Sequence, residues 1–371
     1  MKAVSVKTLR FARKNVVLCV AILAAFLTSL IVRPDRQYLS YFDFKTLTCL
    51  FCVLAVVCAL KDINFFYIMA QKIVKYFHNV RMSVLALVYI TFIGSMLIAN
   101  DMALLTFLPL GYFVPNSTGK QKYMAFTFIM QNIAANLGGM LTPFGNPQNL
   151  YLYTKFNIPN GEFVRIMLVP FVIAIVLITI CCMFLKKEPL EIVDNHTHIS
   201  RKRVALYGML FALAIAIVFR GIPYQLGLVI IPAVLFVVDR HALKIVDYPL
   251  LLTFVAFFIF AGNMARIDVV QQLFDFLLEK STLLFSIFSC QFISNVPSAI
   301  LLSQFTDDYR QLLWGVNIGG VGTLIASLAS LITFREYTSH NPGKTGYYVA
   351  LFSTFNFGFL FILTIAVSLL G

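Results

Sequence analysis

Two asparagines stand in polar breaks near the middle of otherwise apolar stretches. Asn100 lies in Ala99-Asn100-Asp101, within the stretch 83–114, and Asn295 lies in Ser294-Asn295-Val296-Pro297, within 282–306. The side-chain carbonyl of an asparagine can coordinate a cation, and its amide group can donate to an oxyanion. Asp101 adds a carboxylate that could hold a cation or a proton. We therefore predict that these two breaks bind a small ion or anion.

Two further breaks follow these stretches along the chain. The run Thr142-Pro-Phe-Gly-Asn-Pro-Gln-Asn149 cannot continue a regular helix, and the run from Asn317 to Thr323 is rich in glycine. An interrupted helix exposes amide groups at one half and carbonyls at the other. The small residues of the second run could instead serve close helix packing. The candidate binding residues are Asn100, Asp101, Thr142, Gly145, Asn146, Asn149, Ser294, Asn295, Gly319, Gly320 and Thr323, with a coupling cation expected at Asn100, Asp101, Asn146 and Asn295.

The two halves of the chain repeat one pattern. Asn136-Leu-Gly-Gly-Met-Leu-Thr142 recurs as Asn317-Ile-Gly-Gly-Val-Gly-Thr323, identical at four of the seven positions. In each half the order is a span, an amphipathic segment, a hairpin with a central asparagine, a broken helix and a final span. One extra crossing, 204–219, separates the copies and would invert the second. Inverted repeats of this kind form a site at their interface near the bilayer midplane.

The elements that must position these residues are membrane spans. The chain of 371 residues is 60% hydrophobic and 12% charged, whereas soluble domains carry about a quarter charged residues. We predict an all-α polytopic membrane protein with two inverted repeats, about nine spanning helices, two re-entrant hairpins and broken helices. The expected spans are 15–32, 44–60, 122–156 (broken), 163–185, 204–219, 224–238, 247–264, 310–334 and 346–370.

Charge gives the orientation. Lys and Arg gather in loops on one side of this arrangement, which places the N-terminus in the cytoplasm and the C-terminus outside a plasma or inner cell membrane. The net charge of +13 is then a topology signal, and we expect the bilayer, not nucleic acid, as partner. The amphipathic segments 62–80 and 267–281 should lie along opposite interfaces. The predicted divisions are 1–14 (N-terminal segment), 15–185 (first repeat), 186–222 (linker and linking helix) and 223–371 (second repeat).

Several function classes are disfavoured. The five His residues fall in loops or at segment ends, and the seven Cys lie inside apolar runs. Neither pattern favours a metal centre in the membrane, and we expect no cofactor. The sequence has no HExxH or GxSxG motif and no nucleotide-binding loop, so we expect neither an enzyme nor a subunit that hydrolyses ATP itself. A passive channel stays open as an alternative.

The runs around the breaks resemble a known family. Ala99–Pro109, Leu141–Leu150, Asp247–Asn263 and Ser294–Pro297 are similar to the ion transporter superfamily, in its citrate-transporter-like and arsenite-permease/sodium–proton-antiporter branches. The resemblance implies paired sites formed by hairpins and broken helices, sodium or proton coupling, an elevator-type movement and frequent homodimers. The dicarboxylate branch carries Ser-Asn-Thr at both tips, unlike this chain. We expect an ion-coupled secondary transporter of small anions or oxyacids, such as citrate or dicarboxylates, working by symport or antiport. The alternatives are a sodium/proton antiporter and an arsenite permease.

Overall fold

A computed structural model gives the fold, and it describes residues 15–117, 119–189 and 200–370. The predicted cytoplasmic segment 1–14 and residues 190–199 of the predicted linker lie outside the described residues. Within the described ranges the regular elements are helices, apart from an isolated bridge between Asn79 and Pro189. The prediction of an all-α polytopic membrane protein is confirmed.

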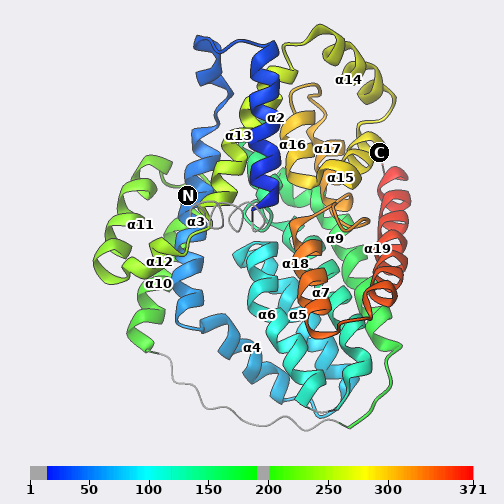
Figure 1. The fold of residues 1–371 in the computed structure, drawn as a ribbon. Coiled ribbons are helices and arrows are strands. Elements are labelled where there is room, and N and C mark those ends of the chain that lie inside the picture. The colour runs from blue at the N-terminus through cyan, green and yellow to red at the C-terminus, as the bar shows by residue number, and fades with distance from the viewer. Residues whose placement is uncertain (1–14, 118, 190–199, 371) are drawn as a thin grey trace, which may run out of the picture.

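The first copy contains two outer helices, an amphipathic helix, a hairpin, a broken helix and a final long helix (Figure 1). In chain order these are α2 (Val16–Ile31), α3 (Phe44–Asp62), α4 (Phe65–Lys75), α5 (Val80–Ile98), α6 (Asn100–Ser117), α7 (Met124–Gly138), α8 (Pro147–Lys155) and α9 (Asn160–Met183). Short 3-10 turns add η1 (Arg36–Tyr41), η2 (Gln121–Tyr123) and η3 (Gly139–Leu141). The linking helix is α10 (Arg201–Val218).

The second copy repeats that order. Its helices are α11 (Tyr224–Val238), α12 (Arg240–Lys244), α13 (Tyr248–Met264), α14 (Asp268–Lys280), α15 (Thr282–Ile293), α16 (Asn295–Leu302), α17 (Tyr309–Ile318), α18 (Leu328–His340) and α19 (Thr345–Ser368). The amphipathic helices α4 and α14 lie near opposite ends of the molecule in Figure 1, as inverted copies require.

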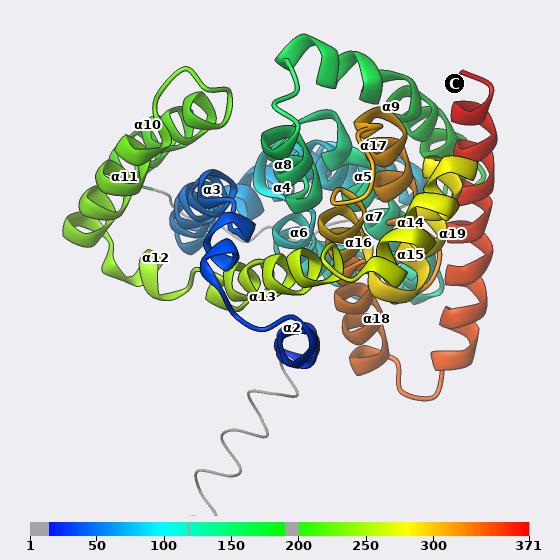
Figure 2. The ribbon, with the colours of Figure 1, turned by 90° about the horizontal axis from the view of Figure 1, so that it is seen from above.

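Reciprocal packing relates the two copies. Helix α2 packs on α13, and its counterpart α11 packs on α3. Likewise α6 contacts α18 while α16 contacts α8, and α9 contacts α17 while α19 contacts α7. Each contact therefore has a partner in which the two copies exchange roles. Figure 2 shows α2 beside α13 on one side, and α10 and α11 beside α3 on another.

In the part of the chain that the structure describes, fewer single helices than the expected nine spans are long enough to cross a membrane without a break. Among the described helices, α3, α5, α9 and α19 are long and apolar enough to cross a membrane, and α2, α11 and α15 are shorter apolar helices. Helices α13 and α14 meet at 96°, as expected for a span that leads into an interfacial helix. Helix α5, predicted as one arm of a re-entrant hairpin, has 19 residues and is itself long and apolar enough to cross a membrane. Helix α18 runs to His340, six residues beyond its predicted end, and α12 and η1 were not predicted.

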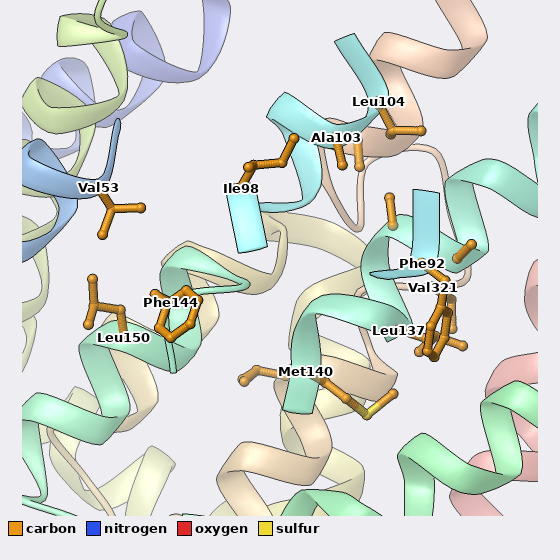
Figure 3. Close-up of a cluster of buried hydrophobic side chains, with 14 of the residues drawn as sticks. Val53, Phe92, Ile98, Ala103, Leu104, Leu137, Met140, Phe144, Leu150 and Val321 are labelled. Carbon is orange, nitrogen blue, oxygen red and sulfur yellow. The ribbon is translucent and has the colours of Figure 1, made fainter. Parts of the chain in front are cut away.

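Buried apolar side chains form a continuous core through both copies. In the close-up of Figure 3, Val53 of α3 points toward Phe144 and Leu150, which lie before and within α8. The broken helix of the first copy thus rests on an outer helix through apolar side chains. Because lipid tails are as apolar as these side chains, close van der Waals packing, and not removal from water, favours this arrangement.

Two polar clusters, one at each end of the molecule, join segments that the charge pattern assigns to the same side of the membrane. At one end Glu188 accepts hydrogen bonds from Lys120 Nζ at 2.7 Å, Lys122 Nζ at 2.6 Å and Tyr123 OH at 2.6 Å. These three hydrogen bonds lower the pKa of Glu188 to about 2. The cluster fastens the chain after α9 to the loop between α6 and α7.

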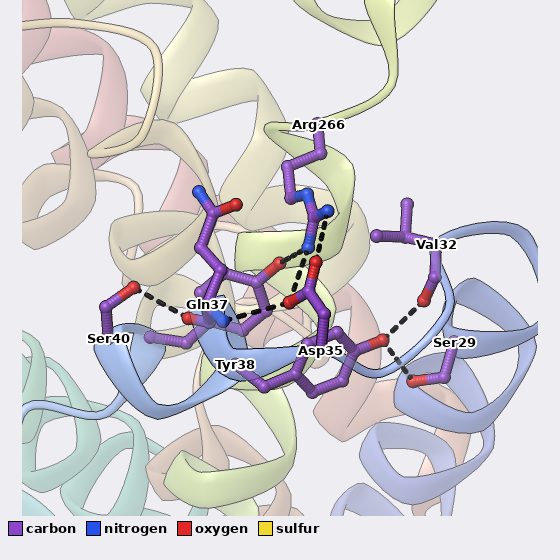
Figure 4. Close-up of polar contacts among 8 residues, drawn as sticks. Ser29, Val32, Asp35, Gln37, Tyr38, Ser40 and Arg266 are labelled. Carbon is purple, nitrogen blue, oxygen red and sulfur yellow. Dashed lines mark hydrogen bonds and ion pairs between the residues drawn. The ribbon is translucent and has the colours of Figure 1, made fainter.

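At the other end, Arg266 donates through Nη1 and Nη2 to the two carboxylate oxygens of Asp35, at 3.2 and 2.7 Å (Figure 4). Arg266 also donates to Tyr41 OH at 3.0 Å. The hydrogen bonds from Arg266 lower the pKa of Asp35. This bidentate pair joins the loop after α2 to the end of α13, and so fixes one outer helix of each copy.

Candidate functional site

Each hairpin turns at one non-glycine residue with a left-handed backbone. Ala99 has φ of 67° and Ser294 has φ of 74°. Such values are uncommon outside glycine and cost energy, so the surrounding structure must impose them. Residues with this conformation are often found at functional sites. The strain ends α5 and α15 abruptly and lets α6 and α16 begin at the next residue.

The asparagine after each turn is held in the same way in both copies. The Asn100 backbone N–H donates to the Gly145 carbonyl at 3.2 Å, and the Asn295 backbone N–H donates to the Ala326 carbonyl at 2.9 Å. In each tip the asparagine Oδ1 accepts from the next backbone N–H, that of Asp101 or of Val296, at 2.9 Å. Each tip is therefore hydrogen-bonded to the irregular segment of its own copy. In both tips the asparagine Oδ1 already accepts one hydrogen bond from the neighbouring backbone.

Most predicted residues of the first break support the backbone. Thr142 Oγ1 donates to the Met96 carbonyl at 2.7 Å and so holds the rising arm of the hairpin. Gly145 presents the carbonyl that anchors Asn100, and a Cβ at Gly145 would lie 2.9 Å from the Gly139 Cα. The position requires glycine because two backbone segments approach each other there.

The second break is held by a residue that sequence reasoning missed. The side-chain Oε1 of Gln291, in α15, accepts from the Thr323 N–H at 2.9 Å. The backbone carbonyl of Gln291 accepts from Thr323 Oγ1 at 3.0 Å. Ser294 Oγ donates to the Ala326 carbonyl at 3.2 Å. A Cβ at Gly319 would lie 2.9 Å from the side chain of Cys290, and one at Gly320 would lie 3.0 Å from Asn295 Nδ2. These glycines therefore admit the second hairpin close to its broken helix.

A buried amide network joins the two broken helices. Asn317 Nδ2 donates to Asn149 Oδ1 at 2.6 Å, and Asn317 Oδ1 accepts from Asn146 Nδ2 at 3.2 Å. Asn100 Nδ2 donates to Asn136 Oδ1 at 3.2 Å, which connects the first tip to the network. The predicted residues Asn146 and Asn149 thus bind the other copy.

Several members of this network were not among the predicted site residues. Asn136 and Asn317 open the sequence repeat, which is the signal that could have identified them. Asn132 donates to Ser330 Oγ at 3.3 Å and to Asn356 Oδ1 at 3.5 Å. The unpredicted members are Asn132, Asn136, Gln148, Asn317, Ser330 and Asn356.

A cavity of about 690 Å³ lies between the two tips. Of the predicted residues it brings together Asn100, Asp101, Ser294 and Asn295. The other seven do not line it. Apolar side chains of α2, α13, α14, α15 and α18 form most of its wall. The two copies therefore meet at one cavity through their hairpin tips, and Pro147 and Gln148 of the first break also line it. The predicted break residues hold the tips in place.

Oxygen atoms without donors mark this region. Asp101 Oδ1 and Asn146 Oδ1 are buried, and no described residue donates to either. The two residues flank the hydrogen bond between Asn100 and Gly145. Carboxylate and amide oxygens suit a hard cation such as sodium, which is bound by oxygen ligands. Within the described ranges, no group of three His, Cys, Asp or Glu side chains could hold a metal ion.

Comparison with known proteins gives a family match and similar proteins from two organisms. A model of the citrate transporter family matches residues 3–308. The "Uncharacterized transporter MJ0456" of Methanocaldococcus jannaschii is 33% identical over 297 residues, which cover 79% of this chain and 81% of that protein. The "Inner membrane protein YbiR" of Escherichia coli K12 is 28% identical over 284 residues, which cover 73% of this chain and 74% of that protein.

Proposed function

The chain belongs to the citrate transporter family, and from this membership and the cavity between its hairpins we propose an ion-coupled secondary active transporter of small anions or oxyacids. The observation that carries the proposal is the meeting of Asn100 and Asn295, one from each copy, at a single cavity. Inverted copies that share a midplane site can expose it alternately to the two sides of a membrane. We further propose that the protein lies in a cell membrane with its N-terminus in the cytoplasm and its C-terminus outside, as the distribution of Lys and Arg among the loops indicates, and that it assembles as a homodimer.

In this proposal Asp101 takes the coupling ion, sodium or a proton. Its buried Oδ1 has no donor among the described residues, and an ionised carboxylate away from water is costly unless a cation or proton neutralises it. The anion then binds at the tips, where α6 and α16 begin at Asn100 and Asn295 and present the positive ends of their dipoles. Binding of the cation therefore favours binding of the anion, which is the basis of coupling.

A sodium/proton antiporter is the second candidate. The observation that favours it is that Asp101 is the one charged residue among the described residues that line the cavity. In that mechanism sodium and protons compete for the Asp101 carboxylate, and no organic solute binds.

Transport by purified protein in liposomes distinguishes the two. We expect a sodium or proton gradient to drive saturable uptake of a labelled organic anion, and Asp101→Asn to abolish it. Asp268→Asn, the same change at an exposed residue of α14, is the matched control and should retain uptake. Sodium-driven proton flux without uptake of citrate, succinate, arsenite or monocarboxylates would favour the antiporter instead. Uptake that never exceeds equilibrium under any gradient would indicate a channel.

A further inference from the structure

The wall of the cavity has an unusual composition for a site that would hold a highly charged solute. Six phenylalanines line the cavity, contributed by α13 (Phe257 and Phe260), α14 (Phe274) and α15 (Phe285, Phe288 and Phe292). Helix α2 adds Val16, Val17, Val20 and Ala24 to the wall. Among the described residues that line the cavity there is no Lys, Arg or His. A solute in this space therefore meets carbon atoms over most of its surface.

The positive potential available at the tips is small. It comes from the N-termini of α6 and α16, which begin at Asn100 and Asn295, and each helix end is equivalent to about half an elementary charge. Together they offset about one negative charge on the solute, once a cation or proton has neutralised Asp101. A second or third carboxylate would lie against the apolar wall without a partner, which is strongly unfavourable.

The tip of the second copy offers a donor for one carboxylate. Asn295 lines the cavity, and its Oδ1 accepts from the Val296 N–H at 2.9 Å. That hydrogen bond fixes the orientation of the side chain, and its Nδ2 finds no acceptor among the described residues. Asn100 differs, because its Nδ2 already donates to Asn136 Oδ1 at 3.2 Å. The two tips are therefore unequal, with a carboxylate acceptor at the first and an unused amide donor at the second.

We propose, on the basis of the transport function proposed above, that the solute of this cavity is a monocarboxylate with an aromatic or branched apolar body. Its carboxylate binds at the Asn295 tip, and its apolar body packs among the phenylalanines. Citrate and other polycarboxylates are excluded by charge. The volume of about 690 Å³ is within the range of about 300–1,000 Å³ for sites that hold organic ligands.

Binding to the purified full-length protein in sodium buffer tests this, with isothermal titration calorimetry of phenylacetate, succinate and citrate. We expect phenylacetate to bind at least about tenfold more tightly than either polycarboxylate. Val20→Trp fills the cavity from α2 and should weaken phenylacetate binding by at least about tenfold. Leu23→Trp is the matched control, since Leu23 is similarly exposed on α2 and does not line the cavity.

A second experiment tests the same proposal through a gain of binding. Val20→Arg introduces a cation into the wall and should confer measurable succinate binding, whereas Leu23→Arg should not. A cooperative thermal unfolding transition, retained in all four variants, shows that each is folded.

The outcomes separate this inference from the transport function. Sodium-dependent binding of citrate or succinate without phenylacetate binding would overturn the proposed solute class and leave an anion transporter. Phenylacetate binding that Val20→Trp does not weaken would overturn the assignment to this cavity. Binding of none of the three acids, together with sodium-driven proton flux, would overturn both proposals.

Discussion

Replacing Asn317 by alanine should weaken the junction between the two copies, because this side chain is the centre of the buried amide network. Asn317 Nδ2 donates to Asn149 Oδ1 at 2.6 Å and to the Leu313 carbonyl at 2.8 Å. A buried hydrogen bond contributes about 1 kcal/mol net, and leaving an acceptor such as Asn149 Oδ1 without a partner costs about 1–3 kcal/mol. We therefore expect Asn317→Ala to lower the free energy of unfolding by about 2–4 kcal/mol.

A double-mutant cycle with Asn149→Ala isolates the bond between the two copies. Measured couplings between polar side chains in membrane proteins average about 0.6 kcal/mol and reach about 1.7 kcal/mol. At 2.6 Å between two fully buried amides, the Asn149–Asn317 coupling should lie in the upper half of that range. Truncation of one partner should accordingly make truncation of the other less damaging.

Unfolding by SDS in mixed micelles gives the free energies. The single tryptophan, Trp314, reports on this region, because it lies three residues before Asn317 and its Nε1 donates to the Ile166 carbonyl at 2.8 Å. Thr354→Ala, an exposed change on α19, is the control and should shift the transition little. The reasoning is refuted if the two alanine effects add to within about 0.3 kcal/mol, since additivity of that quality is typical of independent sites.

Three further outcomes follow from the loops and the helix contacts. The pKa of Glu188 is lowered from 4.5 to about 2, so the ionised carboxylate stabilises the folded protein fully above about pH 4.5, and this stabilisation is lost as pH falls toward 2. Hydrogen exchange at this loop should rise over that window, and Glu188→Gln should remove this pH dependence. Gly138→Ala places a Cβ against the backbone of α5 and should lower the unfolding midpoint in SDS, whereas Gly358→Ala, where the added Cβ meets nothing within 4 Å, should leave it unchanged or raise it. Arg266→Lys loses the bidentate contact with Asp35 and should increase hydrogen exchange in η1, and an unchanged exchange rate there would show that the pair holds nothing in place.

Much of the fold could be predicted because the local signals are strong. Apolar runs bounded by charged loops determine where helices begin and end in a membrane protein, and the helices from α2 to α19 follow the expected order. The hairpin turns at Ala99 and Ser294 stand where polar residues interrupt apolar stretches. The second break could be placed because Asn317–Thr323 repeats Asn136–Thr142. The extension of α18 to His340 and the short helix α12 had no comparable local signal.

The candidate site could be predicted only in part. Asn100, Asp101, Ser294 and Asn295 line the cavity; their binding roles stay predictions. Gln291 and Gln148 escaped notice, the first because it lies in an apolar helix and the second because it stands among stronger candidates in the first break. Each is recognised by its partners, Thr323 for Gln291 and Asn317 for Gln148.

By itself the sequence determined where regular helix cannot continue, since proline, glycine and clustered polar residues act on the backbone of their own segment. It also determined that two such units occur in one chain. Only the tertiary structure decided which polar side chains face a cavity and which join the copies. Asn146 and Asn295 are chemically the same residue, yet the first donates to Asn317 of the other copy and the second lines the cavity. An amide group can bind a ligand or a neighbouring side chain equally well, so its role depends on which atoms the packing of distant helices places within about 3 Å of it.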